Sequence, residues 1–284
     1  MIDMVEARVI AGQISAHLLG KRIAAAELGE RKEKSMRDAH LLRVKPEEFR
    51  ARLGGTALSD AYAKYRHVCI ETDGGFGLDI WDVYGRILFI EKGARMPGNP
   101  PISLGFDDGS SLIVLPGVWA AMRLASNEDL CAFHASSDPN ILDTSSEEFT
   151  LSALKGLIGR EEFERSHIKE VITKHSSPGI MSMMGAYSQE ALYRARIHPK
   201  SKAHALSGKE LASLHRAIQE VTRDAMEVGG RASERDLFDK PGGFVPSVSQ
   251  ATEGNPCPVC GTAIQAIKMG GAGKYYICPG CQVL

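Results

Sequence analysis

Four cysteines near the C-terminus have the clearest chemical pattern in this 284-residue chain. They form two Cys-x-x-Cys pairs, Cys257 with Cys260 and Cys278 with Cys281, and 17 residues separate the pairs. Four thiolates complete the tetrahedral shell of a Zn²⁺ ion, and each two-residue spacer lets both sulfurs of a pair face one point. Because protein fills all four positions, the spacing predicts one structural zinc rather than a catalytic one. An iron–sulfur cluster is the second interpretation, and disulfides are the third.

The segment between the two pairs is too short to fold without help. Its sequence, TAIQAIKMGGAGKYYI, predicts two strands around a glycine-rich turn. A bound metal supplies the stability that so small a hairpin lacks. Lys274, near this turn, could contact a phosphate or only solvent.

Two carboxylates stand at the other end of the chain. Asp3 and Glu6 fall at the start of a helix that the apolar spacing predicts from Val5 to Leu19. Their position allows a helix cap by Asp3 and a first-turn dipole partner in Glu6.

Composition predicts a globular protein of about two domains that stays out of membranes. The chain is 43% hydrophobic and 24% charged, and no run approaches the ~18 apolar residues of a membrane helix. The start lacks a signal-peptide pattern, and Cys69 and Cys131 stand alone as expected in a reducing compartment. We therefore expect a cytoplasmic protein, and a monomer. The net charge of −1 identifies no partner.

The pattern along the chain predicts an α+β, multidomain protein. An N-terminal helix and a β-sandwich are expected over 1–135, because short β-branched or aromatic runs alternate with glycine turns there. A helical domain is expected over 145–240, with helices from about Ser145 to Leu157 and from Glu161 to Lys174. The cysteine hairpin then occupies 250–284.

The strongest helix signal begins at Ser207. Its hydroxyl can cap the helix while Glu210 reaches back in a capping box. One apolar face follows at helical spacing, and Gly229-Gly230 ends the helix. The apolar face consists of Leu211, Leu214, Ile218, Val221 and Ala225.

Three stretches resemble one known family. They are MVEARVIAGQISAHLLGKRI at the start, QEALYRARIHPKSKAHALSGKELASLHRAIQEV in the helical region and PCPVCGTAIQAIKMGGAGKYYICPGCQ at the end. Together they resemble the formamidopyrimidine-DNA glycosylase / endonuclease VIII family. The resemblance implies a helix–two-turn–helix domain followed by a zinc hairpin, both gripping double-stranded DNA with a damaged base or an abasic site. It also implies a nucleoid-associated protein if the chain is bacterial.

The resemblance implies base removal followed by strand cutting through a Schiff base. The family uses the amine of an N-terminal proline as its nucleophile, with a glutamate beside it and another in the helix. Here Ile2 stands at the proline position, so the primary amine of Met1 becomes the expected nucleophile. Asp3 matches the first glutamate with a side chain shorter by one methylene, and Glu6 matches the second.

The family's phosphate contacts are also altered. Lys64 and His67 are the candidates for its lysine on the sandwich. Gly185 lies where the resemblance places an asparagine, and Lys274 lies near the position of a hairpin arginine.

Three functions follow from these residues. The first is a DNA glycosylase or abasic-site lyase with a non-standard nucleophile, either the amine of Met1 or a water activated by Asp3 or Glu6. The second is a lesion-binding protein of the same fold without catalytic activity. The third is a zinc protein with a protein partner. Retained carboxylates favour the first.

Overall fold

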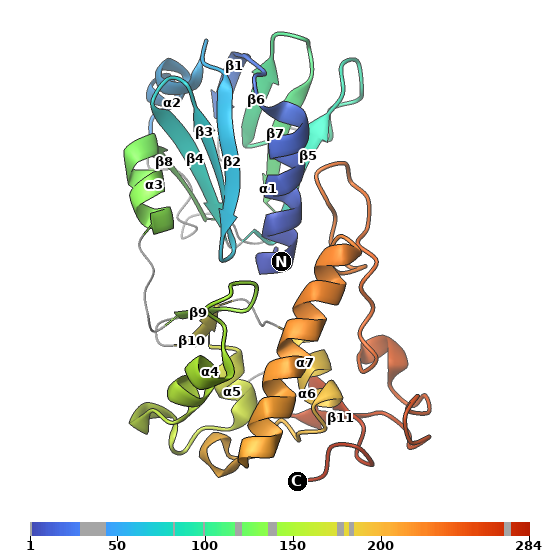
Figure 1. Ribbon diagram of the computed structural model, residues 1–284. Coiled ribbons are helices and arrows are strands. Elements are labelled where there is room, and N and C mark those ends of the chain that lie inside the picture. The colour runs from blue at the N-terminus through green and yellow to red at the C-terminus, as the bar shows by residue number, and fades with distance from the viewer. Residues whose placement is uncertain are drawn as a thin grey trace. The chain divides into compact units, whose positions relative to one another are not determined.

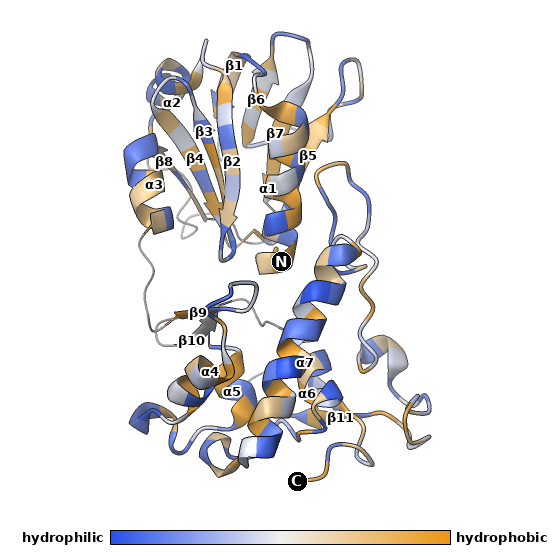
Figure 2. Ribbon diagram, in the orientation of Figure 1, coloured by the Kyte–Doolittle hydropathy of each residue, from blue (hydrophilic) through white to orange (hydrophobic). Residues whose placement is uncertain are grey.

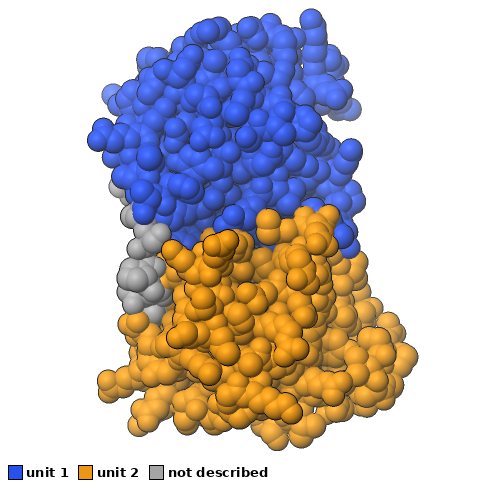
Figure 3. Space-filling model, viewed as in Figure 1, with its two compact units in different colours: residues 1–137, 228–243 blue, residues 138–227, 244–284 orange. Residues whose placement is uncertain are grey.

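The chain forms two compact units, which Figure 3 shows in different colours. The computed structural model describes residues 2–28, 44–81, 83–98, 100–116, 121–135, 141–174, 179–181, 185–269 and 274–284. Unit 1 contains Met1–Ser137 and Val228–Gly243, and unit 2 contains Asp138–Glu227 and Phe244–Leu284. The predicted three-domain boundaries differ from this division, because residues 228–243 group with the sandwich and the cysteine hairpin groups with the helices. The three-domain division stays a prediction.

Unit 1 is built on two four-stranded antiparallel sheets (Figure 1). The first has the order β1 (Ile23–Leu28), β6 (Ile102–Phe106), β7 (Ser111–Pro116), β5 (Gly85–Ile90). The second has the order β2 (Leu58–Lys64), β3 (His67–Thr72), β4 (Phe76–Trp81), β8 (Ala121–Ser126). Apolar side chains from both sheets share one core, so the predicted β-sandwich is confirmed.

Helix α1 (Met4–Leu18) contributes its buried face to the same core. Ile10, Ile14 and Leu18 are fully buried, and α1 contacts β2 and β3. The apolar residues whose spacing predicted this helix therefore form the face that packs into the core.

Two helices of unit 1 were not predicted. Helix α2 (Pro46–Leu53) has only eight residues and buries only Phe49 and Leu53, which is too short a pattern to detect. Helix α3 (Asn127–Ala135) follows β8 directly, with Ser126 Oγ accepting from the backbone N–H of Asp129 at 3.0 Å. No glycine or proline separates the strand from the helix, so the sequence carries no boundary signal there.

Unit 2 is mainly helical. Its helices are α4 (Leu151–Ile158), α5 (Ile168–Ile172), α6 (Gly185–Arg194) and α7 (Gly208–Glu227), with short 3₁₀ turns at Glu161–Phe163, Ala203–Ala205 and Gln250–Thr252. Two short strands, β9 (Ile141–Asp143) and β10 (Gly179–Met181), pair in parallel, and β11 (Gln265–Lys268) pairs with β12 (Lys274–Ile277) in the predicted hairpin. The helix predicted over 161–174 is instead a 3₁₀ turn and the separate helix α5.

Helix α7 confirms the capping box at its start. The Ser207 N–H donates to Glu210 Oε2 at 2.7 Å, and the Glu210 N–H donates to Ser207 Oγ at 3.3 Å. The helix carries hydrophilic residues on one side, as Figure 2 shows, and buries the other. Gly229 and Gly230 follow with φ of 76° and 89°, values that favour glycine.

A single amide of α6 fastens the hairpin to the helices of unit 2. Gln189 is buried, its Nε2 donates to Val248 O at 2.6 Å and its Oε1 accepts from the Tyr276 N–H at 2.7 Å. Gln282 supports the far end, with Nε2 donating to Ile197 O at 3.0 Å. Both contacts satisfy backbone groups that burial removes from water.

None of the helices in the described residues has the length and apolar character that crossing a membrane requires.

Gln189→Ala should lower the free energy of unfolding of the zinc-loaded protein by about 2–4 kcal/mol, because it leaves two buried backbone groups without partners. Urea denaturation measures this change. Gln219→Ala removes an exposed glutamine of α7 and should shift stability by less than about 0.5 kcal/mol. Equal effects of the two substitutions would contradict the role of Gln189.

Candidate functional site

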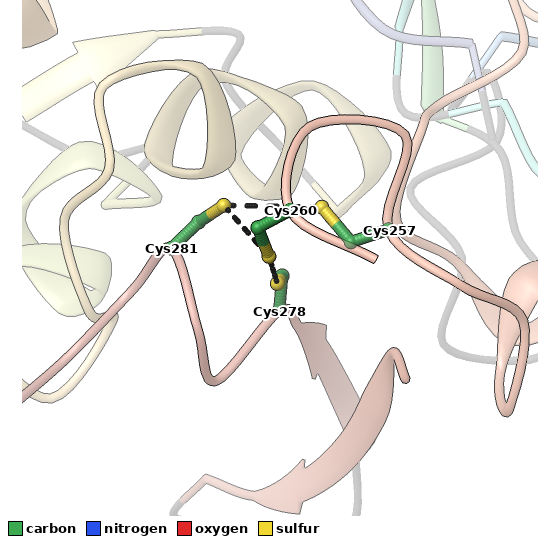
Figure 4. Close-up of side chains that lie close together, drawn as sticks. All are labelled: Cys257, Cys260, Cys278 and Cys281. Atoms are coloured by element: carbon green, nitrogen blue, oxygen red, sulfur yellow. Dashed lines mark hydrogen bonds between the residues drawn. The ribbon is translucent and has the colours of Figure 1, made fainter. Parts of the chain in front are cut away.

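The four cysteines converge on one point in unit 2 (Figure 4). Their sulfurs all lie within 4.8 Å of one another, with 3.8 Å between Cys257 and Cys281 and 3.3 Å between Cys260 and Cys278. A tetrahedral zinc at about 2.3 Å from each sulfur sets neighbouring sulfurs about 3.8 Å apart. The residues present therefore fit one structural zinc, and no ligand position is left for a substrate.

The thiolate cluster has outer support from α6. The Tyr193 hydroxyl lies 3.1 Å from Cys257 Sγ, and both groups are buried. The N–H of Val259 donates to the same sulfur at 3.4 Å. Such donors orient a thiolate and offset part of its negative charge.

Asp3 is a buried carboxyl at the first turn of α1. Its side chain is fully excluded from solvent, and Oδ1 accepts from the Met4 N–H at 2.9 Å. Burial raises the pKa of Asp3 to about 7; Glu6 adds to the rise, while the charges of Arg231 and Arg66 and the bond from Met4 oppose it. A carboxyl with this pKa can exchange a proton near neutral pH.

Glu6 completes the turn and is held by a guanidinium. Its Oε2 accepts from the Asp3 N–H at 3.0 Å, which closes the capping box. Its Oε1 accepts from both the N–H and the Nε of Arg231 at 3.1 Å, and Nη2 of Arg231 lies 3.3 Å from Oε2. The two catalytic candidates Asp3 and Glu6 are therefore brought together, with Arg231 beside them.

Ile2 stands at the position of the family's proline, and its backbone nitrogen is already hydrogen-bonded. The Ile2 N–H donates to Val83 O at 2.9 Å, and the Ile2 side chain is buried in the core of unit 1. Met1, the predicted nucleophile, lies outside the described residues.

At the turn between β2 and β3, Lys64 is buried, and its Nζ donates to Phe133 O at 2.7 Å and to the His134 carbonyl at the end of α3. Arg66 in the turn itself is buried, and its charge acts on Asp3. Sequence reasoning did not identify Arg66.

His67 begins β3 and contacts a buried carboxylate. Its Nδ1 lies 2.7 Å from Asp79 Oδ1, and its ring stacks on Trp81 with centroids 5.1 Å apart. Lys64 and His67, the two candidates for the phosphate contact on the sandwich, are register partners in β2 and β3, and their side chains contact different groups.

The two candidate phosphate contacts in unit 2, Gly185 and Lys274, are both exposed. Gly185 opens α6 with φ of 45° and is exposed, and a Cβ there would meet no atom within 4 Å. Lys274 at the start of β12 is exposed, with Nζ 3.9 Å from Glu253 Oε2.

Comparison with known proteins identifies two domains in unit 2. Residues 142–236 match the formamidopyrimidine-DNA glycosylase H2TH domain, with its last residues in unit 1, and residues 254–283 match the zinc finger found in FPG and IleRS. The match confirms the predicted helix–two-turn–helix domain and the zinc hairpin.

Curated relatives extend the similarity along the chain. A formamidopyrimidine-DNA glycosylase of Geobacter sulfurreducens is 26% identical over 287 residues, covering 99% of this chain and 100% of that protein. The enzyme of the same name from Pelotomaculum thermopropionicum is 36% identical over 143 residues, 48% of this chain and 51% of that protein.

Solved structures share the fold. The complex of Lactococcus lactis Fpg (MutM) with DNA containing N7-benzyl-Fapy-dG superposes with a TM-score of 0.82 at 18% identity, covering 99% of this chain and 100% of that one. The complex of Lactococcus lactis Fpg with abasic-site DNA also has a TM-score of 0.82, at 18% identity and the same coverage. The two domain matches, and a curated relative that aligns over its full length, make the chain similar to formamidopyrimidine-DNA glycosylases, and the solved structures show that it shares their fold.

Proposed function

We propose that the protein binds double-stranded DNA with a damaged base or an abasic site, and acts on it as a DNA glycosylase, abasic-site lyase or both, with a non-standard nucleophile. The matched domains and the DNA-bound relatives support the choice of DNA. One observation carries the enzymatic part: Asp3 is fully buried and its pKa lies at about 7. Carboxyls tuned toward neutral pH cluster at functional sites.

The first route uses water as the nucleophile, because the raised pKa of Asp3 suits this carboxyl to exchange a proton near neutral pH. Asp3 accepts a proton from a water molecule while the oxygen of that water attacks C1′ of the damaged nucleotide. The glycosidic bond breaks, its electron pair leaves with the base, and the proton on Asp3 passes to that base. This route is monofunctional, since the strand stays intact. The amine of Met1 is the second route, and it leads through a Schiff base to strand cutting.

Access to Asp3 requires a change in the first turn of α1, because the carboxyl is shielded and serves as the cap. Binding energy from DNA contacts can drive such a change. Arg66 replaces Lys64 as the candidate cation at this site. In unit 2, the exposed start of α6 at Gly185 offers backbone N–H groups to a phosphate, and Lys274 offers a point charge.

A lesion-binding protein without catalysis is the alternative, and one observation favours it. Both carboxylates have complete structural roles: Asp3 caps α1, and Glu6 joins the capping box and the Arg231 fork. A protein that keeps this turn only for stability retains the DNA-gripping domains and loses the chemistry.

Asp3→Asn separates these two functions. Asparagine caps a helix as well as aspartate does but cannot exchange the proton. We expect base release from duplexes with oxidised bases to fall by about 10²-fold or more, with little change in DNA affinity. Gel analysis of released base and of alkali-sensitive strands measures the reaction. Glu210→Gln, in the capping box of α7, is the matched control and should retain activity.

Each outcome assigns a route. Retained activity in Asp3→Asn means that Asp3 is not the acid/base, and no turnover by the wild type on any lesion supports the lesion-binding alternative. Borohydride trapping on abasic DNA should give no adduct by the water route. A trapped adduct assigns the amine route instead.

The raised pKa of Asp3 predicts a specific pH dependence of stability. Because the folded state holds the proton more tightly than the unfolded state, protonation of Asp3 stabilises the fold fully below about pH 4, and this stabilisation is lost as pH rises through about 7. Urea denaturation between pH 4 and 8 should show Asp3→Asn gaining stability relative to wild type over that range. Asp108→Asn is the control, because Lys21 and Ser110 hold the pKa of Asp108 well below its usual range. Its difference from wild type should be constant above about pH 5, and the same constancy for Asp3→Asn would contradict the raised pKa.

Zinc removal tests the hairpin. A chelator, or Cys278→Ser, should unfold β11 and β12 and weaken binding to abasic-site duplex by about tenfold or more, because the metal joins the two ends of this short hairpin. Metal analysis and fluorescence anisotropy measure the two effects. Cys131→Ser changes an exposed cysteine outside the cluster and should leave both unchanged. Full DNA affinity in metal-free protein would count against a DNA-facing role of the hairpin.

A further inference from the structure

Helix α6 packs against β12 of the zinc hairpin, and its side chains contact this strand at two neighbouring positions. Gln189 accepts from the Tyr276 N–H at 2.7 Å. One residue earlier, Ser188 Oγ accepts from the Tyr275 hydroxyl at 3.3 Å. The proposed function uses the start of α6 and the hairpin as two separate contacts with DNA, whereas these hydrogen bonds connect the two elements.

The hydrogen bond from Tyr275 continues into the first turn of α6. Ser188 Oγ donates its own proton to Gly185 O at 3.0 Å, so two hydroxyls in series end on the first residue of the helix. The directions are consistent, because a serine hydroxyl can accept one hydrogen bond while it donates another. Ser188 and Tyr275 are both buried, so water has little access to either bond. We call Tyr275, Ser188 and Gly185 the hydroxyl relay.

The first turn of α6 needs this support because a glycine begins it. Gly185 has φ of 45°, and glycine has more conformational freedom to lose on folding than any other residue. A Cβ at this position would meet none of the described residues within 4 Å, so packing on that side does not restrain the backbone. The hydrogen bond from the buried Ser188 to the Gly185 carbonyl does restrain it. This bond therefore helps to set the direction of the backbone groups that open the helix.

The other end of the relay depends on the metal. Tyr275 lies in β12, which ends at Ile277, and the next residue is the zinc ligand Cys278. Tyr275 pairs with Ile267 of β11 across the hairpin, so its position is fixed only while the two strands are paired. A hairpin of this size takes its stability from the bound metal. Zinc binding therefore holds the Tyr275 hydroxyl where Ser188 can accept from it.

Tyr193 adds a link in the last turn of α6. Its hydroxyl lies 3.1 Å from Cys257 Sγ. A zinc-bound thiolate has no proton to give, so Tyr193 is the donor when the metal is present. Helix α6 is thus tied to the hairpin near its start through Ser188 and near its end through a metal ligand. Loosening of the hairpin consequently removes contacts from both ends of α6.

We propose that Tyr275 and Ser188 are positioning residues for DNA binding, which transmit the metal-bound fold of the hairpin to the first turn of α6. Zinc then acts on DNA affinity at two places, in the hairpin itself and through α6. This role rests on the proposed function, since it takes damaged duplex DNA as the ligand. Burial of the Tyr275 hydroxyl alone would require only an acceptor. It would not require an acceptor that passes its own proton to the backbone at the start of a helix.

Two variants and a matched control test the relay. Tyr275→Phe removes the first hydroxyl and Ser188→Ala removes the second, and neither residue is a zinc ligand. The DNA is a duplex with a tetrahydrofuran abasic-site analogue. Each variant should keep one zinc per chain, exchange the amide hydrogens of α6 faster and raise Kd by about three- to tenfold, as expected for the loss of one hydrogen bond. Tyr276→Phe should change none of these, because the Tyr276 hydroxyl makes no hydrogen bond within the described part of the chain.

Zinc removal gives a second measurement that needs no variant. Chelation of the wild-type protein should speed amide exchange in α6 as well as in β11 and β12, and added zinc should restore both rates. Hydrogen exchange followed by mass spectrometry separates the peptides of these elements. Faster exchange in β11 and β12 with α6 unchanged would overturn the proposed coupling.

The outcomes distinguish the two proposals. If zinc-loaded wild-type protein does not bind the duplex, the proposed function is wrong, and the role of the relay in DNA binding is wrong with it. If wild-type protein binds, but folded and zinc-loaded Tyr275→Phe and Ser188→Ala share its Kd, then the role of the relay alone is wrong. A purely structural relay would give that second result, because it would change the exchange rates of α6 and leave the Kd of the folded protein as it is.

Discussion

The buried acidic turn at the start of α1 depends on Arg231. Desolvating two carboxylates is costly, and a cation with good geometry offsets that cost. Arg231 supplies it through its backbone N–H and its guanidinium, all directed at Glu6. Gly230 makes the approach feasible, because a Cβ there would stand 3.0 Å from Glu6 Oε1 and its φ is 89°. The segment 228–243 is therefore tied to α1, although both its neighbours in the chain belong to unit 2.

Further contacts secure the same segment to unit 1. Gln13 donates to Asp236 at 2.8 Å and accepts from the Leu237 N–H at 3.0 Å. The Phe89 N–H donates to Leu237 O at 2.8 Å, which adds a backbone contact to β5. These bonds hold Arg231 near Glu6 independently of its own charge. The acidic turn can thus keep its cation even when Asp3 loses or gains a proton.

Sequence patterns predicted the elements whose signals are local. Apolar periodicity predicted α1 and α7, and cysteine spacing predicted the metal centre, because each signal fits within a few turns of chain. The pairing of Glu6 with Arg231 spans 225 residues, so no local pattern announces it. Arg66 was missed for a different reason. Tyr65 in its turn has a φ of 52°, a conformation that glycine or asparagine usually adopts. Because a tyrosine stands there instead, the sequence gave no signal for this turn.

The shorter side chain of Asp3 links its two candidate roles. Aspartate is among the best helix caps and glutamate is not, since the cap needs an oxygen one methylene from Cα. The shorter side chain of aspartate therefore places the carboxyl next to its own helix, where it accepts a hydrogen bond from the Met4 N–H. To reach a sugar, Asp3 has to leave the cap, and the buried Ile2 with its bond to Val83 resists that movement. Chemistry at this carboxyl is consequently coupled to loosening of the first turn of α1, and DNA contacts elsewhere on the protein have to supply the energy for it.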